Sequence, residues 1–253
     1  MSDIPNGMAP HEWSARCDLA ALYRLVAHLR MTDLIDTHIS LRLPGSEGHF
    51  LINRYGTLFE NMKASTLVKI DGQGNVVDEH FPDHRVNRAG FVIHSAIHDA
   101  RQDLHCVIHT HTGAGIAVSA QVNGLLPISQ HALKFYNRIA YHQYEGIALR
   151  IEERTQLVHD LGPSHKAMIL RNHGLLAAGG SIAEAFMNIY FLERACQAQV
   201  QAMAGGSSLI FPDAATCEFT ARQFDGDSEE GIVDLAWKAA LEMIAHQRSE
   251  YRS

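Results

Sequence analysis

The chain is rich in histidine, and three of its histidines stand in segments that suit a metal ion. It holds 17 histidines among 253 residues. His109 and His111 are two positions apart, so on a β-strand both imidazoles would point to the same side. His173 lies in a second segment, 62 residues further along. Three imidazoles with a fourth position left open are what a catalytic divalent ion requires.

Two strands must end side by side if these three histidines are to meet. Residues 104–109 form a short apolar run that is typical of a strand. Residues 167–170 form another, and Arg171-Asn172-His173-Gly174 follows it directly. If the two strand ends are neighbours, the three imidazoles converge. A histidine pair of this spacing also occurs by chance in a histidine-rich chain, so a surface pair is the alternative.

Hydrophobic periodicity and turn residues predict the remaining elements. Helices are predicted over 11–31, 89–100, 116–121, 151–161, 181–203 and 229–247, and strands over 35–43, 49–53, 67–70, 76–77 and 139–141. Because the early strands come in hairpins, we predict an α/β fold of three layers, with helices on both faces of a mixed, mainly antiparallel sheet. We expect one domain over residues 1–253, with a core of about 10–204 and a helical tail over 205–253.

Composition and charge argue against several classes of partner. With 46% hydrophobic and 19% charged residues the composition is that of an ordinary globular protein. The net charge of −7 disfavours nucleic acid or an anionic membrane as the main partner. The four cysteines form no Cys-x-x-Cys pair, no signal segment is visible, and no apolar run reaches about 18 residues. We therefore expect a cytoplasmic protein that acts on a small molecule.

Taken together, these segments resemble the class II aldolase/adducin family, and its bacterial adducin-like branch in particular. The resemblance runs from about Asp18 to Ala204. It is carried by Val107–Gly115 (VIHTHTGAG), Gly124–Pro127 (GLLP), Ala140–His142 (AYH), Ile169–Leu175 (ILRNHGL) and the helix from Glu184 onward.

The resemblance implies a metal site and an assembly. In this family the histidines at the positions of His109, His111 and His173 bind zinc or a similar divalent ion. It therefore implies one divalent ion in this protein, Zn2+ in the first place, with Mn2+ or Fe2+ as alternatives. It also implies a class II aldolase-like fold and a homotetramer whose sites lie at subunit interfaces.

The sequence also departs from the sugar-phosphate aldolases of this family. They carry a Ser-Ser-Glu stretch four residues before a helical histidine, and matching that histidine to His94 places the glutamate at Gly90 and the serines at Arg88-Ala89. The Gly-Asn pair of their phosphate loop is replaced by Thr37-His38. Adducin, which Ala89-Gly90-Phe91 resembles more closely, serves cytoskeletal binding and has an incomplete set of zinc histidines. This chain keeps all three.

Several residues are candidates for acid–base work. His131 lies close to where the aldolases place a catalytic tyrosine, and a histidine there could donate a proton near neutral pH. Tyr141 and Glu145 are further candidates, with an ordinary turn residue as the simpler interpretation of Glu145. His94 and His98 have helical i, i+4 spacing, and we favour a packing role for them because no carboxylate accompanies them.

A second group of residues is predicted to bind the substrate. Arg88 stands where the phosphate-binding serines would be and could seat a carboxylate through bidentate pairing. Arg42, Asn53 and His38 are predicted to help close an anion pocket.

These residues predict a metal-dependent carbon–carbon lyase, either an aldolase or a decarboxylase, on a small hydroxy-carbonyl or hydroxy-acid substrate. Decarboxylation suits the missing glutamate because loss of carbon dioxide generates the carbanion without a base. Two alternatives stay open. One is a non-catalytic, adducin-like binding module. The other is a metal-dependent oxygenase that uses iron at the same histidines.

Overall fold

The computed structural model describes residues 4–45, 48–82, 85–146, 152–227 and 230–253. A seven-stranded sheet forms its centre, with the strand order β3-β2-β1-β4-β7-β6-β5. The strands are β1 His38–Arg42, β2 Phe50–Asn53, β3 Leu67–Ile70, β4 Cys106–Thr110, β5 Ala140–His142, β6 Ala167–Leu170 and β7 Gly174–Gly179. All neighbours pair antiparallel except β5 and β6, which are parallel. The predicted mixed, mainly antiparallel sheet is confirmed.

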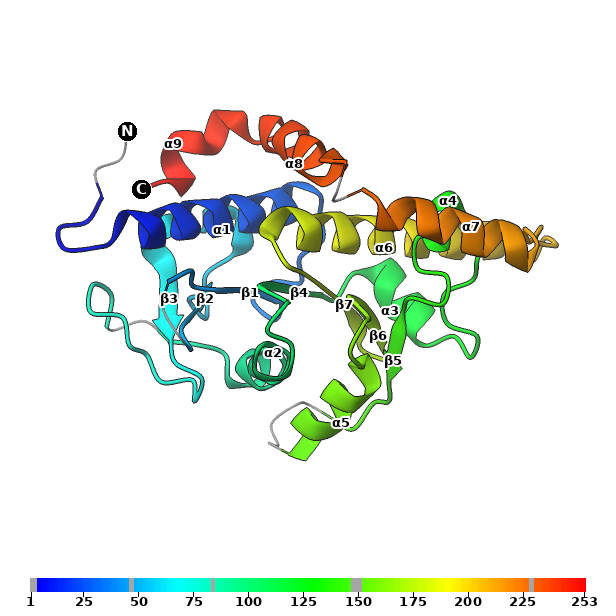
Figure 1. Cartoon of the computed structure of the whole chain (residues 1–253), viewed down its shortest axis with the longest axis horizontal. Coiled ribbons are helices and arrows are strands. Elements are labelled where there is room, and N and C mark those ends of the chain that lie inside the picture. The colour runs from blue at the N-terminus through cyan, green and yellow to red at the C-terminus, as the bar shows by residue number, and fades with distance from the viewer. Residues whose placement is uncertain (1–3, 46–47, 83–84, 147–151, 228–229) are drawn as a thin grey trace.

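Helices cover both faces of this sheet, as Figure 1 shows. The helices are α1 Pro10–His28, α2 Arg88–Ala100, α3 Gly113–Ser119, α4 Gln130–Leu133, α5 Glu152–Leu161, α6 Ile182–Met203, α7 Ala214–Asp225, α8 Ile232–Glu242 and α9 Arg248–Tyr251. Helices α1 and α6 lie on one face, with α8 packed outside them, and α2 and α5 lie on the other. The predicted three-layer arrangement is confirmed.

The two cores on either side of the sheet determine where the histidines point. Alternate residues of a strand face opposite sides. In β4, Cys106 and Ile108 pack into the core formed with α1 and α6, and Val107 packs into the core formed with α2 and α5. His109 therefore faces the α2 and α5 side.

Backbone conformation explains where several predicted elements end. The first helix ends at His28, three residues before the predicted end, because Arg30 adopts a left-handed conformation with φ of 57°. Strand β1 begins at His38 rather than at residue 35, since Leu34 forms a turn with φ of 46°. The predicted helix over 229–247 is shorter, and α8 starts after Gly231, which has φ of 74°.

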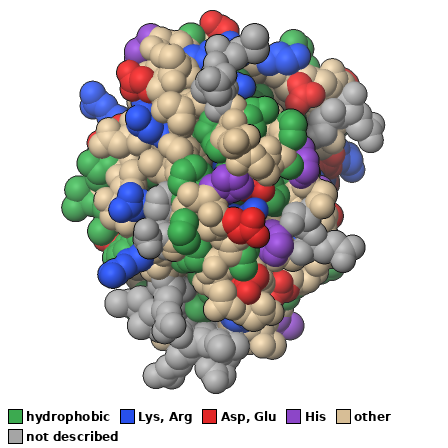
Figure 2. All heavy atoms as spheres, turned by 90° about the vertical axis from the view of Figure 1, so that its left-hand side faces the viewer, with side chains coloured by type: hydrophobic (Ala, Val, Ile, Leu, Met, Phe, Trp, Pro, Cys, Tyr) green, Lys and Arg blue, Asp and Glu red, His purple; other side chains and the backbone are tan. Residues whose placement is uncertain are grey.

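The face of the molecule at the β3 end carries no single kind of side chain. Figure 2 views this face, on which acidic, basic and hydrophobic side chains are intermingled. Within the described ranges, no helix is long and apolar enough to cross a membrane.

Candidate metal centre

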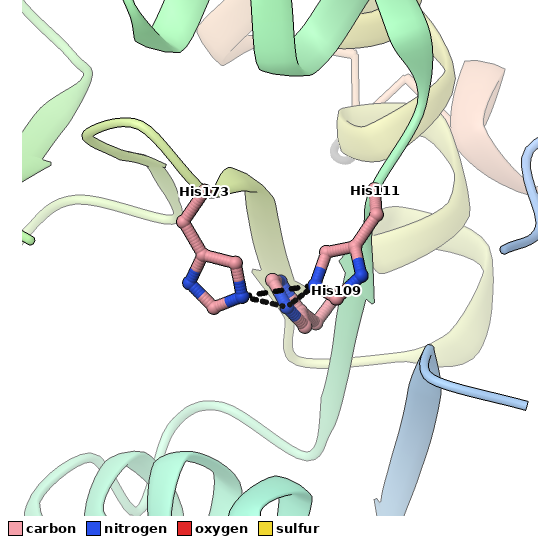
Figure 3. A group of neighbouring side chains, drawn as sticks. All are labelled: His109, His111 and His173. Atoms are coloured by element: carbon pink, nitrogen blue, oxygen red, sulfur yellow. Dashed lines mark hydrogen bonds between the residues drawn. The ribbon is translucent and has the colours of Figure 1, made fainter. Parts of the chain in front are cut away.

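Three imidazoles converge where the inner strands β4 and β7 meet at one end of the sheet, and their Nε2 atoms point toward one another (Figure 3). His109 stands near the end of β4, His111 just beyond it, and His173 in the turn between β6 and β7. The Nε2 atoms are 2.7 Å apart for His109 and His111, 2.9 Å for His111 and His173, and 3.3 Å for His109 and His173. Tetrahedral Zn–N bonds of about 2.0–2.1 Å would place such nitrogens about 3.3 Å apart. The donor set therefore fits a divalent ion with an open coordination position.

The sequence of the β6–β7 turn explains how His173 reaches the other two. Asn172 has φ of 54°, a left-handed conformation that asparagine tolerates better than most residues. A β-carbon on Gly174 would lie 2.4 Å from the carbonyl oxygen of Thr110, so only glycine lets the turn approach β4 this closely. The Arg-Asn-His-Gly segment is thus a steric requirement of the convergence.

Contacts behind the rings fix which nitrogen faces inward. The Nδ1 atom of His109 lies 2.9 Å from the Leu175 carbonyl oxygen, and Nδ1 of His111 lies 3.3 Å from Asp33 Oδ2. A carbonyl or an ionised carboxylate only accepts, so each Nδ1 carries the proton and each Nε2 keeps its lone pair for a metal.

Burial keeps His109 and His173 in the neutral form that binds metals. His109 is 1% exposed, and its burial, together with the surrounding histidines, lowers its pKa well below the usual value. Burial, with His111 and His142 as further causes, lowers the pKa of His173 to about 4. Both imidazoles are therefore neutral at physiological pH.

An open pocket lies beside His173. Its volume, which includes space open to solvent, is about 420 Å³, and it is lined by His173 together with His142, Tyr144, Glu145, Arg154 and Arg171. The predicted acid–base candidate Glu145 lies on this wall and is exposed. The pocket is on the α2 and α5 side of the sheet, which is the side that His109 faces.

A chain of buried hydrogen bonds runs behind the centre. Its contacts are His38 Nδ1 to His94 Nε2 at 2.8 Å, His94 Nδ1 to Ser40 Oγ at 2.6 Å, Ser40 Oγ to His98 Nε2 at 2.7 Å, and His98 Nδ1 to the Leu104 carbonyl oxygen at 3.1 Å. The Leu104 carbonyl can only accept, so every proton in the chain is directed toward it. Each ring is thereby fixed in one tautomer, as expected for buried His94 and His98.

His38, which is predicted to bind substrate, does not line the pocket beside His173. It is 3% exposed, its Nδ1 atom is occupied by His94, and its ring centroid lies 5.0 Å from that of His109. A β-carbon on Gly90 would lie 2.5 Å from Cδ2 of His38. Glycine therefore stands at the position of the aldolase glutamate because the imidazole occupies that space.

Two other predicted substrate residues also lie away from the pocket. Arg42 is four residues beyond His38 along β1, about 13 Å away. There its guanidinium donates to the His98 carbonyl and stacks on Phe50. Asn53 is 3% exposed and accepts a hydrogen bond from the Tyr23 hydroxyl at 3.0 Å. The sheet register, which the local sequence does not determine, places both away from the histidines. Arg88 begins α2, and its side chain lies outside the described part of the chain.

The sheet separates Tyr141 and His131 from the three histidines of their own chain. The Tyr141 hydroxyl accepts from the Leu125 backbone N–H at 3.1 Å, and its ring packs against the core formed with α1 and α6. His131 lies in α4, with its ring centroid 5.0 Å from that of Phe191 on α6. Neither residue lines the pocket beside His173, and their catalytic roles stay predictions.

His142 is a titratable residue of the pocket wall that the sequence patterns did not single out. Nδ1 of His142 lies 2.8 Å from Oδ2 of Asp160 on α5. His142 follows Ala140 by two positions on β5, and Ala140 packs into the core on the α2 and α5 side. Strand alternation was the available signal, since it places His142 on the same face as His109.

Comparisons with known proteins agree with the motifs. A family model described as "Class II Aldolase and Adducin N-terminal domain" matches residues 17–200. A Caulobacter vibrioides protein named "Putative aldolase class 2 protein" is 49% identical over 242 residues, which cover 95% of this chain and 92% of that one. The alpha-adducin of Rattus norvegicus is 43% identical over 219 residues, which cover 85% of this chain and 30% of adducin.

Solved structures share the whole fold. An aldolase II superfamily protein from Pseudomonas syringae has a TM-score of 0.93 at 48% identity, and the match covers 98% of both chains. The L-fuculose 1-phosphate aldolase from Glaciozyma antarctica PI12 has a TM-score of 0.82 at 28% identity, covering 100% of this chain and 97% of that one. By sequence and by structure, the chain belongs to the class II aldolase and adducin N-terminal domain family.

Proposed function

We propose that this protein is a divalent-metal-dependent carbon–carbon lyase that acts on a small hydroxy-carbonyl or hydroxy-acid substrate. The observation that carries the proposal is the convergence of three imidazole Nε2 atoms within 3.3 Å beside an open pocket. His109, His111 and His173 would hold the ion, with Zn2+ as the first candidate and Mn2+ or Fe2+ as alternatives. When bound, such an ion supplies Lewis acidity to a carbonyl or hydroxyl oxygen.

The chain's own residues leave two lyase reactions in the proposal. Gly90 provides no carboxylate, so an aldol cleavage must take its base from another residue. A decarboxylation needs only an electron sink and a proton donor, because departure of carbon dioxide leaves the electron pair on the substrate. The fuculose phosphate aldolase among the structural relatives supports the aldol reaction.

Two alternatives have observations behind them. Similarity to alpha-adducin favours a non-catalytic binding module. A module of that kind has no need of three converging imidazoles, two of which have their tautomers fixed from behind, so we prefer the lyase. An iron-dependent oxygenase would use the same three ligands and differs in requiring oxygen.

A homotetramer is part of the proposal. His131 and Tyr141 lie across the sheet from the histidines of their own chain, so a catalytic role for either requires a neighbouring subunit. Light scattering of the purified protein tests the assembly, and a monomeric mass would remove both residues from the reaction.

The function is tested by metal analysis followed by substrate screening. The purified protein is loaded with Zn2+, Mn2+ or Fe2+, its metal content is measured, and cleavage of hydroxy-ketones, sugar acids and hydroxy-aromatic acids is followed. His109→Ala serves as the inactive variant and His159→Ala, at an exposed histidine, as the matched control. Protein that binds no divalent ion would overturn the proposal. Bound metal without turnover would favour the binding module, and oxygen uptake with iron the oxygenase.

A further inference from the structure

His142 and Asp160 form a hydrogen-bonded pair on the wall of the pocket that His173 also lines. Nδ1 of His142 lies 2.8 Å from Oδ2 of Asp160, and the His142 side chain is 10% exposed. The other carboxylate oxygen accepts from Gln156 Nε2 at 2.7 Å and lies 3.3 Å from His159 Nδ1. One carboxylate oxygen thus has its partner on β5 and the other has its partners on α5, and together they hold the group in one orientation.

The charge state of Asp160 determines the tautomer of His142. Burial of the carboxyl opposes ionisation, but hydrogen bonds from His142, His159 and Gln156 outweigh it and lower the pKa of Asp160. The carboxylate is therefore ionised at neutral pH and can only accept. The His142 proton lies on Nδ1, and Nε2 carries a free lone pair.

The backbone fixes this imidazole relative to the metal ligands. The Arg171 N–H donates to the His142 carbonyl at 2.8 Å, so the end of β5 is tied to the Arg-Asn-His-Gly turn that carries His173. Among the described residues, none forms a hydrogen bond with Nε2 of His142. A free Nε2 on the wall of a pocket, oriented by a half-buried carboxylate, is the arrangement of a general base.

We propose that His142 transfers the proton in the lyase reaction and that Asp160 is its positioning residue. This inference rests on the proposed function. In an aldol cleavage, Nε2 of His142 takes the proton of the substrate hydroxyl, and the O–H electron pair forms the new carbonyl. The pair of the broken carbon–carbon bond moves to the released carbon, and the His142 imidazolium returns the proton to that carbon. His142 and Asp160 thus take over the proton transfer for which Gly90 offers no group.

The first test follows the reverse of that last proton transfer. Hydroxyacetone, the smallest ketone with an adjacent hydroxyl, is incubated in D2O with metal-loaded protein, and NMR follows exchange of its carbon-bound protons. We expect His142→Gln to lower the exchange rate by about 100-fold or more while its metal content equals that of the wild type. His246→Gln, at an exposed histidine of the short turn 245–247 that does not line the pocket, should leave the rate unchanged. An exchange rate of the His142→Gln protein within twofold of the wild-type rate would overturn the inference.

Asp160→Asn separates positioning from a merely structural role. Loss of the carboxylate should lower the apparent pKa of the exchange profile, because the imidazolium loses its counter-charge. The other charged or titratable groups facing His142 are His159 on α5, His173 on the turn, and Glu145, Arg154 and Arg171 around the pocket. All are unchanged in this variant. A pH profile identical to that of the wild type would remove Asp160 from the mechanism.

A second measurement does not depend on turnover. Diethylpyrocarbonate acylates a free imidazole nitrogen, and mass spectrometry of the metal-loaded protein reports the rate at His142. We expect acylation of His142 in the wild type and a several-fold lower rate in Asp160→Asn. The proposed lyase function would be contradicted if the wild-type protein binds metal and is acylated at His142 but catalyses no exchange of hydroxyacetone protons. Absence of acylation at His142 would contradict only the proton-transfer role.

Discussion

Nδ1 of His109, on β4, lies 2.9 Å from the carbonyl oxygen of Leu175 on the neighbouring strand β7. The two strands pair antiparallel, with Leu176 opposite His109. The hydrogen bond therefore comes from the sheet itself, and the metal-binding nitrogen is oriented as soon as β4 and β7 pair.

The first prediction concerns stabilisation by metal. A ligand that binds only the folded state raises stability by about 2.7 kcal/mol at 100 times its Kd, so Zn2+ should raise the Tm of the wild type. His109→Ala should weaken binding by about 100-fold or more and abolish most of that rise. His159→Ala should respond like the wild type. An undiminished shift in His109→Ala would place the metal elsewhere.

The second prediction concerns acid stability of the metal-free protein. Burial lowers the pKa of His94 well below the usual value and that of His98 to about 3. The unfolded chain takes up these protons below pH ~6.5, whereas the folded protein does not until about pH 3, so stability is complete above pH 6.5 and falls below it. Each histidine should contribute about 1.4 kcal/mol per pH unit to this loss.

Urea unfolding between pH 7.5 and 5 measures that slope. His98→Gln should reduce the dependence of unfolding free energy on pH by the contribution of one proton, about 1.4 kcal/mol per pH unit, whatever its effect on absolute stability. His159→Gln, at a side chain that is 79% exposed, should leave the slope unchanged. An unaltered slope in His98→Gln would mean that His98 is protonated in the folded protein.

The third prediction concerns a buried ion pair that attaches α1 to the sheet. The Arg16 side chain is fully buried and contacts Glu12 at 2.9 Å, Asp78 at 2.5 Å and the Leu67 carbonyl at 2.9 Å. Arg16→Leu should cost about 3–5 kcal/mol, because it leaves the buried Asp78 carboxylate without its cationic partner. Arg138→Leu, which breaks a partly exposed pair, should cost less than about 1 kcal/mol. Equal losses in urea unfolding would contradict this difference.

The fourth prediction is a double-mutant cycle between Gly90 and His38. Gly90→Ala should destabilise the protein by about 1–3 kcal/mol, because its β-carbon overlaps the imidazole. In the double variant Gly90→Ala/His38→Ala that overlap is gone. The double variant should therefore lose less stability than the sum of the losses in the two single variants, by about 1 kcal/mol or more. Gly113→Ala, where no atom lies within 4 Å, should change stability little. Additive effects in the cycle would contradict steric exclusion.

The sequence predicted the elements and ligands that local patterns determine. The long helix α6 has a clear apolar stripe and a Ser181 cap that accepts from the Glu184 N–H at 3.1 Å. The histidines were found because strand alternation and a short turn suffice to aim them. Strand β7 was missed because its segment GLLAAG is buried on both faces and shows no alternation. Helix α7 was missed as well, although Asp213 caps it.

The positions of several predicted site residues relative to the three histidines depend on non-local contacts. Whether Tyr141, Asn53 or Arg42 faces the histidines depends on strand register and on which helices cover each face, and no local pattern determines either. His142 was missed because its partner Asp160 lies on a helix 18 residues away. Proximity of that kind becomes visible only once α5 packs against β5.

The exclusion between position 90 and His38 also constrains how such a site can change over evolutionary time. A lineage that acquires a glutamate at position 90 while His38 is present must fit two side chains into one space. Replacing His38 by a smaller residue first leaves only a cavity, which a folded protein tolerates better than overlap. Interconversion of histidine-type and carboxylate-type sites is therefore expected to begin at position 38, and ancestral sequences that pair a small residue there with glycine at 90 would mark the route.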